Sequence, residues 1–496
     1  MMTWETVIGL EVHAQLATRT KIFSGALVEF GADPNTNVTP LCLGLPGTLP
    51  VLNKQVVELS MRMSLAVGCQ IQPRSRFLRK NYFYPDLPKG YQISQFQSQE
   101  EMPLATGGEI EVPTADGGTR FVRLVRIHME EDAGKSIHDE DFVPVGESMV
   151  DYNRTGVPLI EIVSEPDMRA PAEAAAYVTR LREILIYTGA SLGDMEKGHV
   201  RIDANVSIRP EGSSELGTKV ELKNMNSIRN CQRALEIEVD RQIETLEAGG
   251  EIRQETMLFD PVREDVRPMR SKEESDDYRY FPDPDLVPIL VDQEWIDRVA
   301  EQVPELPAAK RERFAAEYGF DDGIVEVLIA DRSTADYFER VVGAGADARQ
   351  AANWVQGDVL RLVNETGAAV DDLKVTSDSL AALIKLVAND TISGSIARKV
   401  FQEMAYTGDD PSAVVDRLGL AQISDEGELE STVDQVLADH LDEVEKFKGG
   451  NKKLMGFFMG QVMKATKGQA NPKLATQLIQ KKLSCPRRAR SRPDMV

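Results

Sequence analysis

The chain has 496 residues, a formal net charge of −23 and an ordinary globular composition in which 42% of residues are hydrophobic. No uncharged apolar run of about 18 residues occurs, so neither a transmembrane helix nor a secretory signal is expected. The four cysteines form no C-x-x-C pair, which excludes a clustered-cysteine zinc or redox motif and makes a cytoplasmic location the expectation.

The first 290 or so residues predict an α+β domain dominated by antiparallel sheet. Short runs with alternating or continuous apolar residues recur, and they predict strands. The predicted strands are TVIGLEVHAQL, RFVRLVRIHM, VPLIEIVS, HVRIDANVSIR and TKVELKN. Two helices are expected between them, at 171–188 and from about 228 to 248.

From about residue 293 onward the pattern predicts helices alone. The expected helices are 295–302, 307–317, 323–330, 332–341, 412–418, 428–446, 450–467 and 471–483. The run YTGDDPSA at 405–412 is typical of a linker.

Charge is distributed unevenly in the last hundred residues. Residues 401–450 hold 13 acids against 3 Lys and Arg, whereas residues 451–496 hold 11 Lys and Arg against one acid. A basic segment at the end of an acidic protein is a candidate surface for nucleic-acid phosphates, although a solvated helix would show the same charge.

Acidic and histidine side chains interrupt the predicted strands. Glu11 and His13 are two residues apart, so a strand places them on one face. His128, Glu130 and Asp132 alternate in the same way next to Glu131, although such a cluster also occurs in solvated turns.

Two further carboxylates lie on other predicted strands. Glu161 interrupts an apolar run, where a buried carboxylate needs a partner or a cation. Asp203 lies on the polar face of its predicted strand. Together these acids suit Mg²⁺, which prefers oxygen ligands and commonly shares them with nucleotide phosphates.

The run 80–95, KNYFYPDLPKGYQISQ, interleaves lysine and tyrosine, including Lys80 and Tyr82. Such residues can stack a base and hold a phosphate, but a tyrosine-rich hairpin would show the same pattern. The polar, aromatic run 269–288 suggests no mechanism by itself.

In this order, the segments resemble those of the family of aspartyl/glutamyl-tRNA(Asn/Gln) amidotransferase B subunits. The matching runs are ETVIGLEVHAQL, KNYFYPDLPKGYQISQ, HMEEDAGKS, TGVPLIEIVSEPD, RIDANVSIRP, TKVELKNMNSIRN, SKEESDDYRYFPDPDLVP and GFFMGQVMKATKGQANPKLATQLI. They span roughly residues 3–483 and are long and distinctive.

The resemblance implies three regions: a sheet-rich cradle domain at 1–293 with the catalytic site, a helical domain at 294–408, and a YqeY-like tail domain at 409–484 that binds tRNA. The basic C-terminal extension at 485–496 lies beyond the resemblance and is assigned no role. The resemblance also implies a ligase reaction. ATP and Mg²⁺ serve to phosphorylate the side-chain carboxylate of Glu-tRNA(Gln) or Asp-tRNA(Asn), and ammonia from a partner amidase (glutaminase), the A subunit, then displaces phosphate. The heterotrimer is completed by a small C subunit. Which tRNA is used is left open, as is the alternative of a non-catalytic tRNA-binding scaffold.

Carried over by motif, the metal-site residues are expected to be Glu11, His13, Glu130, Glu131, Glu161 and Asp203. The choices between Glu130 and Glu131, and between Glu161 and Glu165, stay open. Lys80 and Tyr82 are expected to line the pocket for the tRNA 3′ end, with Glu131 near the ammonia exit. Some members bind zinc through paired cysteines; Cys42 and Cys69 stand alone, so no zinc is expected.

Overall fold

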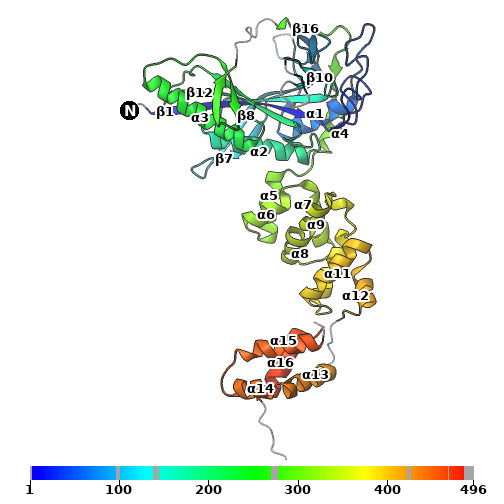
Figure 1. Cartoon of the computed structure of the whole chain (residues 1–496). Helices are drawn as coiled ribbons and strands as arrows, with labels where there is room; N and C mark the ends of the chain where they lie inside the picture. The colour runs from blue at the N-terminus through cyan, green and yellow to red at the C-terminus, as the bar shows by residue number, and fades with distance from the viewer. Residues whose placement is uncertain are drawn as a thin grey trace, which may run out of the picture. The chain divides into compact units, whose positions relative to one another are not determined.

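Two compact units make up the chain, Met1–Lys310 and Arg311–Val496. The computed structural model describes residues 3–96, 101–137, 143–144, 146–269, 278–421, 426–466 and 469–484 (Figure 1). The first unit is built around a mostly antiparallel sheet and the second is helical, so the predicted α+β class is confirmed. No described helix is long and apolar enough to cross a membrane. The predicted extension 485–496 lies outside the described residues.

A 13-stranded sheet forms the centre of the first unit, with the strand order β15-β14-β13-β12-β1-β11-β8-β5-β4-β16. The strands on this path are β1 (Trp4–Gln15), β4 (Leu78–Asn81), β5 (Tyr91–Ser94), β8 (Thr119–Glu131), β11 (Pro158–Ser164), β12 (Val200–Pro210), β13 (Val220–Lys223), β14 (Thr256–Asp260), β15 (Asp265–Pro268) and β16 (Phe281–Pro282). Off the path, β2 (Gln70–Ile71) pairs with β6 (Ala105–Thr106), which pairs with β8, as does β7 (Glu109–Pro113). Among the described pairs of this sheet, β13–β14 alone is parallel.

Two small sheets complete the strands of this unit. They are the pair β9 (Lys135–Ile137) and β10 (Met149–Asp151), and the pair β3 (Arg74–Ser75) and β17 (Ile289–Leu290).

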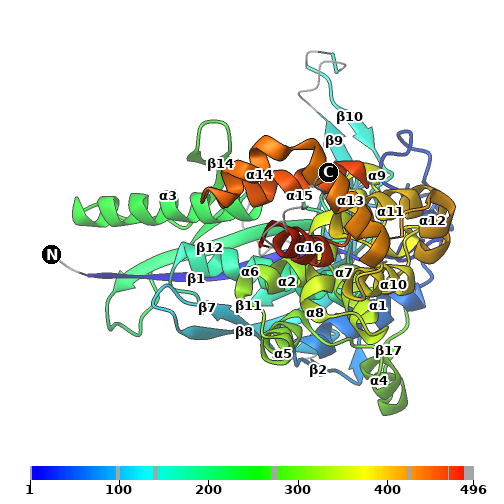
Figure 2. The same ribbon diagram turned by 90° about the horizontal axis from the view of Figure 1, so that it is seen from below.

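Three helices pack against the sheet: α1 (Lys54–Ala66), α2 (Pro171–Tyr187) and α3 (Ile228–Glu247) (Figures 1 and 2). Alternation along β1 buries Ile8, Leu10 and Val12 in the same apolar core as the helices, which leaves the intervening residues on the other face. Helix α3 starts where Ser227 accepts a hydrogen bond from the Asn230 amide, a common N-cap. The helices predicted at 171–188 and 228–248 are thus confirmed to within a residue or so.

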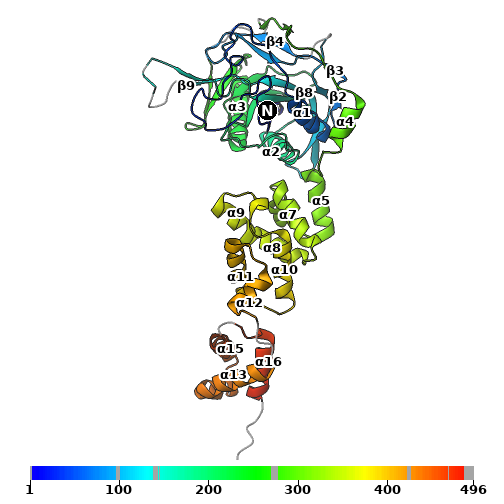
Figure 3. The ribbon, with the colours of Figure 1, turned by 90° about the vertical axis from the view of Figure 1, so that its right-hand side faces the viewer.

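The remaining helices follow in chain order. They are α4 (Gln293–Ala300), α5 (Pro307–Tyr318), α6 (Asp322–Ile329), α7 (Arg332–Gly343), α8 (Ala348–Trp354), the π-helical turn η2 (Val355–Val359), α9 (Leu360–Thr366), the 3₁₀ turn η3 (Val370–Asp372), α10 (Ser377–Ala388), α11 (Gly394–Thr407), α12 (Pro411–Leu418), α13 (Glu426–Asp439), α14 (Leu441–Lys448), α15 (Leu454–Ala465) and α16 (Pro472–Ser484) (Figure 3).

The second unit contains two apolar cores. One joins residues from Phe314 to Val415, and the other joins residues from Leu429 to Leu483. The predicted linker 405–412 is shorter than expected, because α11 continues to Thr407 and Pro411 already begins α12. The domain boundaries at 293 and 408 stay a prediction.

The helix predicted at 428–446 is two helices. His440 takes a non-helical conformation, with φ −128° and ψ 50°, and its ring packs edge-on against Phe457 at 5.0 Å. The helix is therefore interrupted at His440, between the end of α13 at Asp439 and the start of α14 at Leu441.

Candidate metal centre

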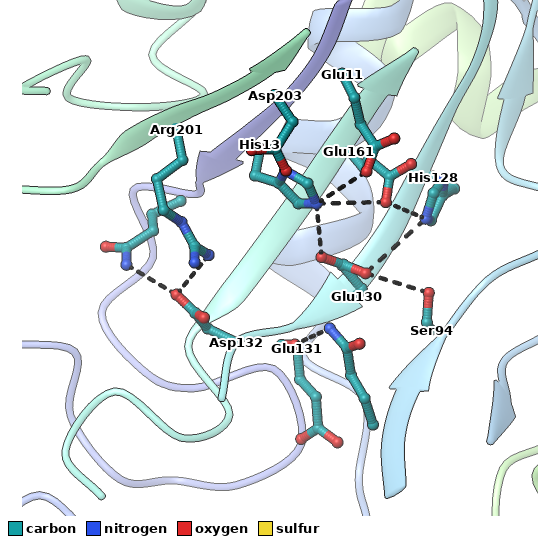
Figure 4. A network of polar contacts seen from close by, with 12 residues as sticks. Glu11, His13, Ser94, His128, Glu130, Glu131, Asp132, Glu161, Arg201 and Asp203 are labelled. Atoms are coloured by element: carbon teal, nitrogen blue, oxygen red, sulfur yellow. Dashed lines mark hydrogen bonds and ion pairs between the residues drawn. The ribbon is translucent and has the colours of Figure 1, made fainter. Parts of the chain in front are cut away.

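Strand register brings the predicted histidine and carboxylates into one row across the sheet. His13 on β1 is the direct partner of Glu161 on β11, which is in turn the partner of His128 on β8. Glu11 lies two residues from His13, and Glu130 two residues from His128, so alternation puts all five on one face (Figure 4). We call Glu11, His13, His128, Glu130 and Glu161 the carboxylate–histidine cluster.

The atoms of this cluster lie within reach of one cation or two. His13 Nε2 is 3.4 Å from Glu161 Oε2, 3.6 Å from Glu130 Oε1 and 3.7 Å from Glu11 Oε1. His128 Nε2 is also 3.4 Å from the same Glu161 oxygen. Two groups of three ligand atoms result, one with Glu11 and His13 and one with His128 and Glu130, and Glu161 belongs to both.

The cluster carries more negative than positive charge. Glu130 and Glu161 are buried. Among the described residues, the permanent cation in contact with this group of carboxylates is Arg126, whose Nη2 lies 3.5 Å from Glu161 Oε1. Burial, followed by repulsion from Glu161, raises the pKa of Glu11. Burial lowers the pKa of His13, but the three carboxylates outweigh it and raise the value to about 9.

This donor set fits a divalent cation. Three carboxylates from three neighbouring strands supply hard oxygen ligands, and an excess of buried negative charge is costly unless a cation offsets it. The imidazole of His128, and that of His13 once the cation displaces its proton, add nitrogen ligands, which are less usual for Mg²⁺ than oxygen. The predicted metal residues Glu11, His13, Glu130 and Glu161 are therefore brought together.

Two predicted metal residues, Glu131 and Asp203, belong to neither ligand group. The side chain of Glu131 points away from the cluster (Figure 4). Its carboxylate contacts Lys89 Nζ and accepts a hydrogen bond from the Ile93 amide at 2.9 Å. Asp203 is the register partner of Glu11, but its carboxylate accepts a hydrogen bond from Lys223 Nζ at 2.8 Å. Glu165, the alternative to Glu161, follows the end of β11 and belongs to neither ligand group.

An aromatic wall lies beside Lys80 and Tyr82. The Lys80 ammonium is 4.8 Å from the centre of the Tyr278 ring, and the Tyr82 and Tyr278 rings are 6.0 Å apart. Tyr280 continues the wall and stacks on Phe96 at 4.5 Å. Burial lowers the pKa of Lys80, but the charges of Tyr280, Glu130 and other nearby groups outweigh it and raise the value, so the ammonium form is favoured.

Sequence reasoning missed His128 and Tyr278 as site residues. For His128, the sequence offered a signal, because this residue alternates with Glu130 along one predicted strand. For Tyr278 there was none, because the pairing of β16 with β4 that brings it to Lys80 joins segments about 200 residues apart.

A cavity of about 260 Å³ opens next to Glu11. Its lining combines small and polar residues from β1, β11, β12 and the following loop. They include Gly9, Ser164, Asn205, Ser207, Gly217 and Lys219.

Comparison with known proteins identifies the family. Residues 6–297 match the model of the GatB/GatE catalytic domain, and residues 336–483 match that of the GatB domain. The aspartyl/glutamyl-tRNA(Asn/Gln) amidotransferase B subunit of Solidesulfovibrio magneticus is 53% identical over 97% of this chain and its own full length. The proteins of that name from Thermoanaerobacter sp. and Geobacter sulfurreducens are 51% and 50% identical over the same shares. The chain therefore belongs to the family of aspartyl/glutamyl-tRNA(Asn/Gln) amidotransferase B subunits.

Proposed function

We propose that this chain activates the side-chain carboxylate of a misacylated tRNA, Glu-tRNA(Gln) or Asp-tRNA(Asn), by phosphorylation with ATP, and that ammonia then displaces phosphate to form the amide. The observation that carries the proposal is the carboxylate–histidine cluster, with its excess negative charge, next to a lysine set in an aromatic wall. A carboxylate is a poor electrophile, and phosphorylation supplies the leaving group that amide formation needs.

The carboxylates of Glu11, Glu130 and Glu161, with His13, would hold Mg²⁺. When bound, the ion offsets the charge that develops on the transferred phosphoryl group. Glu130 is preferred to Glu131 and Glu161 to Glu165, because only the first of each pair contributes to a described ligand group.

The cavity next to Glu11 is the proposed site for the nucleoside of ATP. Gly9 leaves room for close approach, Ser164 and Ser207 offer hydroxyls, and Lys219 supplies a cation for phosphate. A nucleotide bound there would extend its phosphates toward the cluster, since Glu11 lines both sites.

The 3′ end of the tRNA would lie on the aromatic wall. Tyr82 and Tyr278 present rings on which a base can stack, and the Lys80 ammonium can hold the carboxylate that becomes phosphorylated. Because Glu130 and Glu161 are among the charges that act on Lys80, the reacting carboxylate would be near the transferred phosphoryl group.

Ammonia would arrive on the Glu131 side of β8. Glu131 is buried against Lys89, and its carboxylate could accept a proton from ammonium before the amine attacks. The source would be the glutaminase partner, the A subunit, with a small C subunit bracing the pair. The basic helices α15 and α16 are the proposed contact for tRNA phosphates outside the active site.

The test uses the reconstituted heterotrimer, with ADP release followed in the presence of ATP, Mg²⁺ and glutamine. ADP release that requires Glu-tRNA(Gln) or Asp-tRNA(Asn) would establish carboxylate activation and name the substrate. No ADP release with either tRNA, from a heterotrimer whose amidase hydrolyses glutamine, would favour the alternative of a non-catalytic tRNA-binding scaffold.

A further inference from the structure

A buried lysine and a buried cysteine lie against each other outside the carboxylate–histidine cluster. Lys21 is 1% exposed and Cys42 is 4% exposed, and Lys21 Nζ is 3.6 Å from Cys42 Sγ. The ammonium also donates to the Tyr152 carbonyl at 3.3 Å. The sulfur is 3.3 Å from Thr39 Oγ1 and 3.9 Å from Ser24 Oγ.

The surroundings of Lys21 favour a thiolate at Cys42. Among the described residues, the acceptors of the ammonium are a sulfur and a carbonyl, and no carboxylate forms an ion pair with it. The more distant charges of Asp151 and Glu131 also act on Lys21, but less than Cys42 does. A buried cation without an anionic partner is costly, and a thiolate would neutralise it. Burial alone raises the pKa of Cys42, but the hydrogen bonds from Thr39 and the charge of Lys21 outweigh it and lower the value.

The other two described cysteines lie in the opposite environment. Burial raises the pKa of Cys69 to about 12 and that of Cys231 to about 12. Cys69 Sγ donates its hydrogen to the Gly107 carbonyl at 2.8 Å, as a neutral thiol does. Among the described cysteines, Cys42 is therefore the one placed to react as a nucleophile.

We propose that Cys42 and Lys21 form a site of reversible oxidation by hydroperoxides, at which a covalent S–N bond joins the two side chains. The Cys42 thiolate attacks one oxygen of the peroxide and the O–O bond breaks, which converts the thiolate to a sulfenic acid. The leaving group, hydroxide when the oxidant is hydrogen peroxide, takes a proton and leaves as water. The neutral amine of Lys21 then attacks the sulfur, the S–O bond breaks and water leaves.

The balance is one thiol, one amine and one hydrogen peroxide to one sulfenamide and two waters. Burial lowers the pKa of Lys21, which makes the neutral amine more accessible than at an exposed lysine. Two equivalents of an external thiol reverse the bond, returning the cysteine and the lysine and forming one disulfide. The reaction does not depend on the proposed function.

The site is joined to the chain segment that follows Glu131. The Ile22 amide donates to the Gly156 carbonyl at 3.0 Å, and the Gly156 amide donates to the Asp132 carbonyl at 2.8 Å. The S–N bond would remove the ammonium hydrogen bond to Tyr152 in this same segment.

The test is peptide mapping of the full-length chain after treatment with hydrogen peroxide at neutral pH. No Lys or Arg lies between residues 22 and 53, so blocked cleavage after Lys21 should give one tryptic peptide of residues 20–54. We expect this peptide to be lighter by two hydrogen atoms than the same peptide without a crosslink, and fragmentation should locate the bond between Lys21 and Cys42. Dithiothreitol should restore cleavage after Lys21, while Cys69 and Cys231 should alkylate as in untreated protein. A Cys42 without a crosslink, whether unoxidised or oxidised to sulfenic or sulfinic acid, would overturn the proposal, and a crosslink that retains an oxygen atom would overturn the S–N bond.

Two substitutions of Lys21 separate the effect of its positive charge on Cys42 from the role of its amine as a nucleophile. Lys21→Arg keeps a cation but removes the amine, so Cys42 should still form a sulfenic acid, trapped by a 1,3-diketone, without a crosslink. Lys21→Met removes the cation, and oxidation should slow about tenfold for each unit by which the thiol pKa rises. Cys231→Ser is the matched control and should crosslink like the unmodified chain; a crosslink that formed equally in Lys21→Arg would refute the assignment of Lys21.

Discussion

Replacement of Glu161 by Gln is the most direct test of the carboxylate–histidine cluster. Glu161 belongs to both ligand groups and is buried, so the change removes one negative charge at little cost in volume. A divalent cation and a unit charge about 4 Å apart interact by about 8 kcal/mol at an effective dielectric constant of about 20, and the cost of removing the carboxylate from water offsets much of this. Part of the loss is offset, because the substitution also relieves the repulsion that raises the pKa of Glu11.

We therefore expect Glu161→Gln to weaken Mg²⁺ binding by about 2–4 kcal/mol, or about 30- to 900-fold in Kd. Calorimetric titration of the full-length chain with Mg²⁺, and with Mn²⁺ as a paramagnetic substitute, measures the change. Glu165→Gln is the matched control, because the same substitution four residues later lies outside both ligand groups. Its Kd should stay within about a factor of two of the unmodified chain, as expected for a site without contact.

The metal-free stability of the two variants provides a check on folding. Glu161→Gln should unfold at a lower temperature than the unmodified chain without Mg²⁺ but remain cooperatively folded. Burial raises the pKa of Glu161, but His128 and His13 outweigh it and lower the value, so the fold favours the charge that the substitution removes. Unchanged Mg²⁺ affinity in a folded Glu161→Gln variant would refute the cluster as the metal site. An equal loss in Glu165→Gln would show that the effect is not specific to the cluster.

The other predictions concern amide formation, tRNA binding and stability. Glu131→Gln should abolish amide formation while ADP release with misacylated tRNA persists; loss of ADP release as well would place Glu131 in the phosphorylation step. Tyr278→Ala should raise KM for the tRNA about 5- to 150-fold, because a base stack is worth about 1–3 kcal/mol, while glutaminase activity should stay unchanged. An unaltered KM would exclude the aromatic wall from the tRNA site. Replacing Lys452, which lies just before α15, and Lys481 of α16 by Gln should reduce the slope of log K against log salt for tRNA by about 1–2. An unchanged slope would exclude this surface of α15 and α16 from the tRNA interface. Arg241→Met removes the ion pair in which Arg241 Nε lies 2.7 Å from the buried carboxylate of Glu238 on α3. It should lower the free energy of unfolding by about 2–4 kcal/mol in urea titrations, and a change below about 0.5 kcal/mol would contradict a stabilising role for this pair.

Alternation along single strands made much of the sheet face predictable. Glu11 with His13, and His128 with Glu130, share a face whenever their segments form strands, and apolar neighbours identified those segments. The break at His440 was not predictable in this way, because it depends on a ring contact with a residue of another helix.

Contacts between distant segments limited the prediction of the site. The Asp203 carboxylate accepts a hydrogen bond from Lys223, and the Tyr278 ring lies against the Lys80 ammonium. Both contacts depend on strand pairing and side-chain direction, which no local sequence pattern encodes. Register also favours one of two alternatives that spacing left open, since Glu161 is the partner of His13 whereas Glu165 lies beyond the end of β11.

The adjacent residues Glu130 and Glu131 show why a strand suits the proposed two-step reaction. Successive side chains of β8 point to opposite sides, so Glu130 joins the carboxylate–histidine cluster while Glu131 contacts Lys89. A carboxylate for the metal and a carboxylate for the incoming amine can thus lie one residue apart and yet remain on separate sides of the backbone. Inserting one residue in β8 before Glu130 would exchange the two sides, because a shift of one residue reverses every side chain that follows. The pairing of β8 with β11 over Ile127, His128 and Met129 fixes that register, and so the fold of the sheet itself keeps the two proposed steps apart.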